Sequence, residues 1–241
     1  MSGHWTAYPG PDQAAEACSR HILALLESAL SGEGDATLAI SGGSTPKLLF
    51  AHLAKSEFDW RQVHFFWVDE RAVPPTDPQS NYRLAEEHLV IPGHVPHRNL
   101  HRIAGELPPE KAAKRYSDEI REYFGLDPGE LPHFDITHLG TGPDSHTASL
   151  FPGEPLIEDR QGLAAAVLNH AIPQWRVSLL PGVLLASRHT AFLVAGEDKA
   201  EAVYNIFHQP YDPLHYPAQV VTHHGRRVTW FLDEAAARRL D

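Results

Sequence analysis

The chain has 241 residues, of which 42% are hydrophobic and 21% charged, so it is long enough for one globular domain with a sizeable core. Its 31 acidic and 20 basic residues give a formal net charge of −11, which argues against nucleic-acid binding because that needs a basic surface. We see no run of 18 apolar residues and no signal-peptide pattern, so we expect no membrane partner. The single cysteine, Cys18, excludes an internal disulfide and favours a cytoplasmic location.

Helix-like and strand-like segments alternate along the chain. Apolar residues at helical spacing predict a helix over 12–30, and an apolar run stopped by glycines predicts a buried strand over 36–43. We then expect a helix over 45–55, a central strand over 63–70 and helices over 80–90 and 108–125. A strand over 134–142 leads into a short helix expected at 146–151. The chain closes with strands over 176–180 and 189–195, a helix over 198–208, a strand over 228–234 and a terminal helix over 235–240.

Strands separated by helices favour an α/β fold with a mostly parallel sheet and helices on both faces. We find no internal repeat or convincing linker, so residues 1–241 are predicted to form a single domain. Ligands of such sheets bind at the carboxyl ends of the strands. Three polar clusters fall at predicted strand ends, and we interpret them as parts of one site.

The first cluster is SGGSTP at 41–46, between a strand and a helix. Gly42 and Gly43 let the backbone turn tightly and approach a ligand closely. The following helix offers free N–H groups and a positive dipole end to a phosphate, and Ser44 and Thr45 add hydroxyl donors. A tight turn with an ordinary N-cap is the alternative. Neither a Walker A loop nor a nucleophile elbow occurs in the chain.

The second cluster is Asp69-Glu70-Arg71, which follows the apolar run VHFFWV. Charges at the end of an apolar strand must be solvated, paired or used on a ligand. The planar fork of Arg71 is suited to clamping an anion. A salt bridge among these three residues is the alternative interpretation.

The third cluster is GTGPDSHT at 140–147. Histidine is the natural base for activating a water near neutral pH, and Asp144, two residues before His146, is placed to orient the imidazole. A helix cap or a surface histidine is the alternative. The cluster therefore predicts a general base if it meets the other two.

Two isolated cations and a histidine group complete the candidates. Lys199 opens a helix, where the dipole disfavours a cation, and Arg176 starts a strand. Each serves an anion or is a solvated surface residue. His94, His97 and His101 have an approximate ligand spacing, but their proline-rich loop disfavours a zinc site, and we expect no metal.

The motifs SGGSTPKLL, FFWVDERAVPPTDPQSNYRLAEEHL, LGTGPDSHTASLFPG and GEDKAEAV, with the closing VTWFLDEAA, resemble those of the 6-phosphogluconolactonase family. This family lies within the glucosamine-6-phosphate isomerase/deaminase superfamily, and the resemblance spans nearly the whole chain. It implies a three-layer α/β sandwich with a modified doubly wound sheet. It also implies hydrolysis of 6-phospho-D-glucono-1,5-lactone to 6-phosphogluconate, the second step of the oxidative pentose phosphate pathway. We expect no cofactor, a phosphorylated sugar lactone as the partner, and a monomer or weak homodimer.

The resemblance also implies roles for the candidate residues. His146 is then the general base that activates water for attack on C1, Asp144 is its partner, and Asp69 lies beside the sugar. The phosphate is held by Gly42, Gly43, Ser44, Thr45, Arg71, Arg176 and Lys199. Because a lactone carbonyl is already electrophilic, a positioned water and one base suffice without metal or covalent intermediate.

The chain departs from the family pattern at two positions, and two other functions compete. Ser145 stands where the family usually has glycine, so a positive φ there would strain the turn and shift His146. Thr141 replaces a commonly apolar residue. A related deaminase or isomerase of amino-sugar phosphates is disfavoured because Phe151 stands where those enzymes have a glutamate. A sugar-phosphate sensor is disfavoured by the acidic charge and the lack of a helix-turn-helix module.

Overall fold

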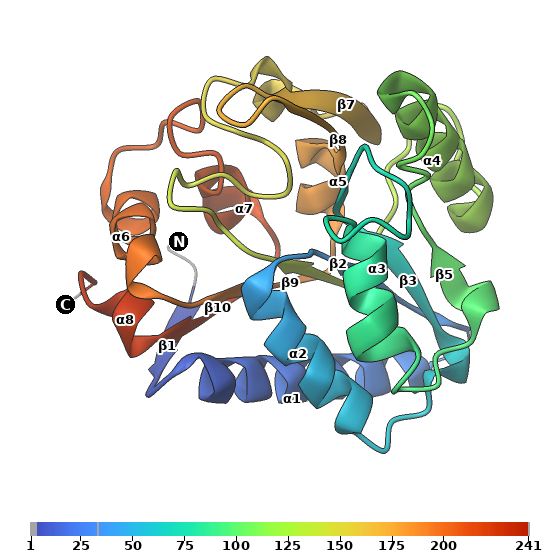
Figure 1. The fold of residues 1–241 in the computed structure, drawn as a ribbon, viewed down its shortest axis with the longest axis horizontal. Helices are drawn as coiled ribbons and strands as arrows, with labels where there is room; N and C mark the ends of the chain where they lie inside the picture. Colours follow the sequence, from blue (N-terminus) through green and yellow to red (C-terminus); the bar gives the residue numbers. More distant parts are fainter. Residues whose placement is uncertain (1–3, 33, 241) are drawn as a thin grey trace.

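A large parallel sheet forms the centre of the computed structural model, which describes residues 4–32 and 34–240 (Figure 1). Seven strands of this described part follow the order β1-β10-β9-β6-β2-β3-β5. They are β1 (His4–Tyr8), β2 (Ala36–Ile40), β3 (Val63–Trp67), β5 (Leu100–His101), β6 (Ile136–Leu139), β9 (His189–Val194) and β10 (Val228–Asp233). A smaller antiparallel sheet has the order β4-β8-β7, with β4 (Asp69–Arg71), β7 (Ala164–Asn169) and β8 (Gln174–Leu179).

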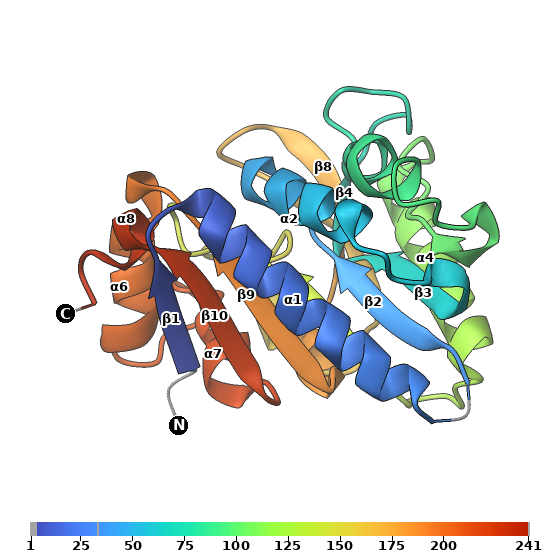
Figure 2. The ribbon, with the colours of Figure 1, turned by 90° about the horizontal axis from the view of Figure 1, so that it is seen from below.

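Helices cover both faces of the large sheet, which confirms the predicted α/β class. On one face lie α1 (Pro11–Leu30) and α2 (Ser44–Lys55), seen in front of the strands in Figure 2. On the other side lie α4 (Pro109–Phe124), α5 (Pro181–Ala186) and α7 (Gln219–His224) (Figure 1). The remaining helices are α3 (Asn81–Ala85), α6 (Ala200–His208) and α8 (Glu234–Ala237). None of the described helices has the length and apolar character that crossing a membrane requires.

The core is apolar on both sides of the sheet because helices exclude water from both faces. All five residues of β2 are buried. On β9 and β10, which pair with each other, the rings of Phe192 and Trp230 stack with their centroids 3.9 Å apart. The buried hydroxyl of Tyr116 on α4 donates to the carbonyl oxygen of Trp67 at 2.7 Å and accepts from its N–H at 2.9 Å. This pair of hydrogen bonds fixes α4 to the end of β3.

Two predicted elements are wrong, and both errors lie next to the site. The strand expected over 63–70 is two strands, because the chain changes sheets at Val68. The Val68 N–H donates to Ile40 at 2.9 Å in the large sheet, and its carbonyl accepts from Leu179 at 2.8 Å in the small one. The segment 146–151, expected to be helical, is a turn closed by a bridge between Thr147 and Leu150. Ala148 within it has a φ of 51°, which a right-handed helix does not allow.

Candidate active site

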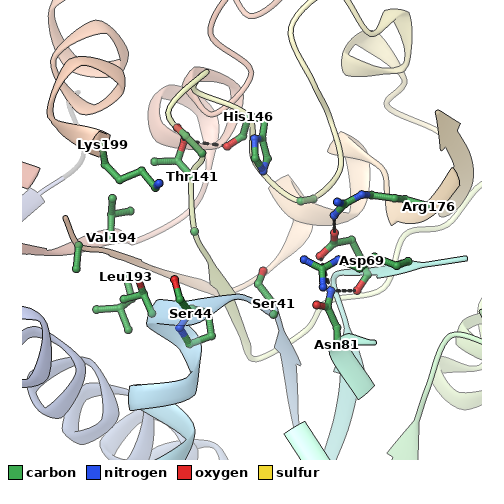
Figure 3. A pocket seen from close by; sticks show the side chains of 18 residues that line it. Ser41, Ser44, Asp69, Asn81, Thr141, His146, Arg176, Leu193, Val194 and Lys199 are labelled. Carbon is green, nitrogen blue, oxygen red and sulfur yellow. Dashed lines mark hydrogen bonds and ion pairs between the residues drawn. The ribbon is translucent and has the colours of Figure 1, made fainter. Parts of the chain in front are cut away.

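The carboxyl ends of β2, β3, β6 and β9 open onto one cleft, because parallel strands end at the same edge of their sheet. The cleft holds about 650 Å³ of empty space, including its part open to solvent. Figure 3 shows His146 and Lys199 directed into this space above Ser41 and Ser44, with Arg176 and Asp69 opposite. Segments far apart in the sequence therefore meet where the three polar clusters were expected to meet.

Most of the predicted site residues line this cleft. They are Gly42, Ser44, Thr45, Asp69, Arg71, His146, Arg176 and Lys199. Gly43 and Asp144 are not part of the lining. Gly43 precedes α2 with a φ of 124°, which favours glycine, and no side chain caps this helix. Asp144 reaches the cleft only through its contact with His146.

Three neighbours hold the imidazole of His146. Its Nδ1 lies 2.6 Å from Oδ1 of Asp144, which also accepts the His146 backbone N–H at 3.2 Å. Gly142 lies against the ring so closely that a Cβ on Gly142 would come within 2.3 Å of it. The ring of Phe151 lies with its centroid 4.9 Å from that of the imidazole. The orientation of His146 is thus set by a carboxylate, a glycine and an aromatic ring.

The electrostatics of the pair of Asp144 and His146 favour one tautomer of the imidazole. Burial raises the pKa of Asp144, but the hydrogen bonds and charge of His146 together lower it by more, so the pKa lies below its usual value. Ionised at neutral pH, this carboxylate can only accept, so Nδ1 of His146 carries the proton. In the neutral imidazole the lone pair then lies on Nε2, which faces no such acceptor among the described residues and can take a proton.

The turn around His146 contains two non-glycine residues in left-handed backbone. Ser145 has a φ of 67° and Ala148 a φ of 51°. Such a conformation costs an L-residue about 1–2 kcal/mol. The positive φ that was expected to strain the turn at Ser145 is therefore present. Ser145 is buried and held by its neighbours, since its N–H donates to Gly142 at 3.1 Å and its carbonyl accepts from Ala218 at 3.0 Å.

Arg71 and Arg176 face each other across β4 and β8. Like charges directly opposite each other destabilise a strand pair. Both Nε atoms are buried and have no hydrogen-bond partner within the described chain. Burial lowers the pKa of Arg176, and the positive charge of Arg71 lowers it further. The charge of Asp69, whose Oδ2 lies 3.7 Å from Nη1 of Arg176, acts in the opposite direction and raises the pKa. The strand pair therefore presents two guanidinium groups to the cleft, and the carboxylate of Asp69 neutralises their positive charge only in part.

Lys199 reaches the cleft from the opposite side. It ends a single 3₁₀ turn, Glu197–Lys199, which leads into α6. Its ammonium group pairs with the exposed carboxylate of Asp198. Because Asp198 is well solvated, this pair competes weakly with an anion in the cleft.

The proposed alternative of a salt bridge within Asp69-Glu70-Arg71 is wrong. Asp69 is buried and accepts from Oγ of Ser149 at 2.6 Å. The Glu70 carboxylate accepts four hydrogen bonds, from the N–H groups of Arg71, Asn81 and Tyr82 and from the hydroxyl of Ser80. Burial raises the pKa of Glu70, and these hydrogen bonds oppose the rise. Glu70 is therefore structural and holds the start of α3 against β4.

Several residues that shape the cleft had been assigned no role from the sequence, although Ser41 belongs to the first predicted cluster. Asn81 donates from Nδ2 to the carbonyl of Asp69 at 2.9 Å, and its amide lies so close to Gly42 that a Cβ there would be 1.9 Å from Oδ1. Ser41 donates from Oγ to the carbonyl of His138 at 3.0 Å. Leu193, after the middle of β9, gives the cleft an apolar wall. The only signal for Asn81 was its place at a helix start, which equally predicts a helix cap.

The histidines considered for zinc are not brought together. His101 pairs instead with Nδ1 of His64 at 2.9 Å and with Glu119 at 3.0 Å. Across residues 4–32 and 34–240, no three or more His, Cys, Asp or Glu side chains are grouped to hold a metal ion.

Comparison with known proteins gives a consistent result. A family model described as glucosamine-6-phosphate isomerases/6-phosphogluconolactonase matches residues 9–230. A 6-phosphogluconolactonase of Haemophilus influenzae is 38% identical, covering 84% of this chain and 87% of its own, and one of Homo sapiens is 41% identical, covering 84% and 80%. The crystal structure of a 6-phosphogluconolactonase from Thermotoga maritima is 29% identical, with a TM-score of 0.80 over 96% of this chain and 99% of its own. The chain belongs to the glucosamine-6-phosphate isomerase/6-phosphogluconolactonase family.

Proposed function

We propose that this chain hydrolyses 6-phospho-D-glucono-1,5-lactone to 6-phospho-D-gluconate, in the second step of the oxidative pentose phosphate pathway. The observation that carries the proposal is one cleft that combines the His146–Asp144 pair with the cations Arg71, Arg176 and Lys199. A base without cations would suit any ester, and cations without a base would suit a sugar-phosphate receptor. The names of the relatives support the same activity.

In the proposed reaction His146 acts as the general base. Nε2 takes a proton from a water molecule while the water oxygen bonds to C1 of the lactone. The resulting imidazolium is stabilised by the Asp144 carboxylate at Nδ1. As the tetrahedral intermediate collapses, the bond between C1 and the ring oxygen breaks, and the imidazolium returns its proton to that oxygen. The immediate products are a hydroxyl group and a carboxylic acid on the open chain. The acid then ionises to the carboxylate by releasing its proton to solvent, and the base is restored.

The phosphate of the substrate is proposed to bind between the start of α2 and the cations. Gly42, Gly43, Ser44 and Thr45 supply backbone and hydroxyl donors there, and Arg71, Arg176 and Lys199 supply charge. This binding energy is realised far from C1, so it anchors the ring while leaving the reacting carbon free to change geometry. We propose that Asp69, held by Ser149, binds sugar hydroxyls beside His146.

We also propose that residues 1–241 form one catalytic domain. The reaction uses no metal or other cofactor, since a lactone carbonyl needs only a positioned water and a base. The location is cytoplasmic, which fits a chain with one cysteine. The enzyme acts as a monomer or weak homodimer, which sedimentation at several protein concentrations tests.

The test is hydrolysis of freshly generated 6-phosphogluconolactone, with gluconolactone and glucosamine 6-phosphate measured in parallel and spontaneous opening subtracted. We expect rapid hydrolysis of the phosphorylated lactone, much slower hydrolysis of gluconolactone and no ammonia from the amino sugar. His146→Ala should lower kcat by about 10²–10⁴-fold with a small change in KM. His215→Ala is a matched control, because His215 forms an exposed pair with Asp212 at 2.7 Å outside the cleft. No acceleration over background by the wild type would refute the function.

A further inference from the structure

Phe151 occupies a place in the site that the proposed reaction leaves unused. The centroid of its ring lies 4.9 Å from that of the His146 imidazole, with the two rings tilted by 50°. Cζ of Arg176 lies 5.7 Å from the centroid of the same Phe151 ring. One side chain thus contacts both the proposed base and a proposed phosphate-binding cation.

Phe151 does not line the cleft. It lines a second hollow, together with Asp144, the loop 152–155 and the end of β7. The ring therefore forms part of the partition between the cleft and this hollow. Because Phe151 is not part of the cleft lining, we expect any effect of this residue on the reaction to pass through its neighbours.

The contacts of the Phe151 ring can restrict the movement of both His146 and Arg176. The hydrogen bond to Asp144 and the backbone of Gly142 hold the His146 ring at its Nδ1 side, and the ring of Phe151 adds a third contact to the imidazole. Arg176 is largely buried, its Nε has no partner within the described chain, and it faces the like charge of Arg71. The electron-rich face of an aromatic ring attracts a guanidinium and holds it in place.

We propose that Phe151 is a positioning residue that fixes His146 for proton transfer and Arg176 for phosphate binding. This inference rests on the proposed lactonase function. It assigns a role to an apolar side chain that touches no reacting atom. It follows that the aromatic ring matters and that bulk alone does not replace it.

The experiment compares kcat and KM of Phe151→Leu and Phe151→Tyr with those of the wild type. We expect Phe151→Leu to lower kcat about tenfold, because the imidazole swings, and to raise KM several-fold, because Arg176 loses the ring. Phe151→Tyr keeps the aromatic ring, so both constants should stay within about twofold of the wild type. Phe58→Leu is the matched control: its ring packs 4.7 Å from that of Trp60, away from the cleft, and its loss should lower Tm without changing kcat or KM.

A double-mutant cycle with Arg176→Gln separates the two parts of the role. Without the guanidinium, Phe151→Leu should still lower kcat about tenfold but should no longer raise KM. The inference is overturned if Phe151→Leu behaves as the wild type, if Phe151→Tyr is as impaired as Phe151→Leu, or if KM rises equally in both backgrounds. An inactive wild type would instead refute the proposed function itself.

Discussion

Replacing Gly142 with alanine should disable the site without unfolding the protein. A Cβ at this position would lie 2.3 Å from both Cε1 and Nδ1 of His146 and 2.7 Å from Oδ1 of Asp144. Ordinary contacts of a Cβ begin near 3.4 Å. The imidazole must therefore move by about 1 Å, and its hydrogen bond to Asp144 must bend or break.

A displacement of about 1 Å between reacting groups costs on the order of 10²-fold in rate. This corresponds to roughly 2.7 kcal/mol of activation free energy. We therefore expect Gly142→Ala to lower kcat about 100-fold. KM should change by less than about threefold, because the methyl group does not reach Arg71, Arg176 or Lys199.

The assay is initial-rate hydrolysis of 6-phosphogluconolactone, with Tm measured alongside to show that the variant is folded. Gly140→Ala is the control in the same turn, since its Cβ would lie at an ordinary 3.7 Å from the carbonyl oxygen of Leu193. It should keep kcat within about fivefold of the wild type. A Gly142→Ala enzyme with wild-type kcat would show that His146 need not sit where the structure has it, and the reasoning would fail.

Three other substitutions test the electrostatics of the site. Asp144→Asn should lower kcat at least 100-fold, because an amide can donate to Nδ1 and reverse the imidazole tautomer. Because the pKa of Asp144 is lower in the folded state, the stability that its carboxylate contributes is present above about pH 4 and is lost as pH falls through that lowered pKa. Urea denaturation of the wild type and of Asp144→Asn should therefore show the difference between their free energies of unfolding shrinking as pH falls through this range. A difference that grew there would contradict the lowered pKa. Glu70→Gln should lower the free energy of unfolding by about 2–4 kcal/mol, because the NH₂ group of the glutamine would face a backbone N–H that has lost its carboxylate acceptor. An unchanged Tm would exclude a structural role of Glu70. Arg176→Gln should raise KM for the phosphorylated lactone about 10–100-fold while gluconolactone hydrolysis stays near the wild-type rate; equal losses on both substrates would place Arg176 elsewhere than on the phosphate.

The parallel sheet could be predicted because its strands carry a strong local signal. β2, β3 and β9 are apolar runs, since helices bury both of their faces. β1 gave no such signal: His4–Tyr8 is largely exposed and joins the sheet only by pairing with β10. β7 was missed for a different reason: the run Ala164–Asn169 begins with three alanines, which are disfavoured in strands, and it is only half-buried. The short helices α5 and α7 span six residues each, too few for helical periodicity to show.

The candidate site was predictable to the extent that its residues lie in segments that follow strands. Ser44, Lys199 and His146 lie in the segments after β2, β9 and β6, and parallel strands end together. The pairing of Arg71 with Arg176 depends on the change of sheet at Val68, which no local pattern indicates. The support of His146 by Phe151 depends on a turn whose left-handed backbone contradicts the local helical preference of the sequence.

The opposition of Arg71 and Arg176 has a consequence for the folding equilibrium. Two hydrogen-bonded strands hold the guanidinium groups against their mutual repulsion whenever the cleft contains only solvent. A bound dianion removes that repulsion in the native state and has no comparable site on the unfolded chain, so occupancy and stability are thermodynamically linked. A phosphorylated ligand should therefore shift the thermal melting curve upward by more than an equal concentration of its unphosphorylated analogue. Melting temperature thus becomes a measure of ligand affinity that requires no turnover.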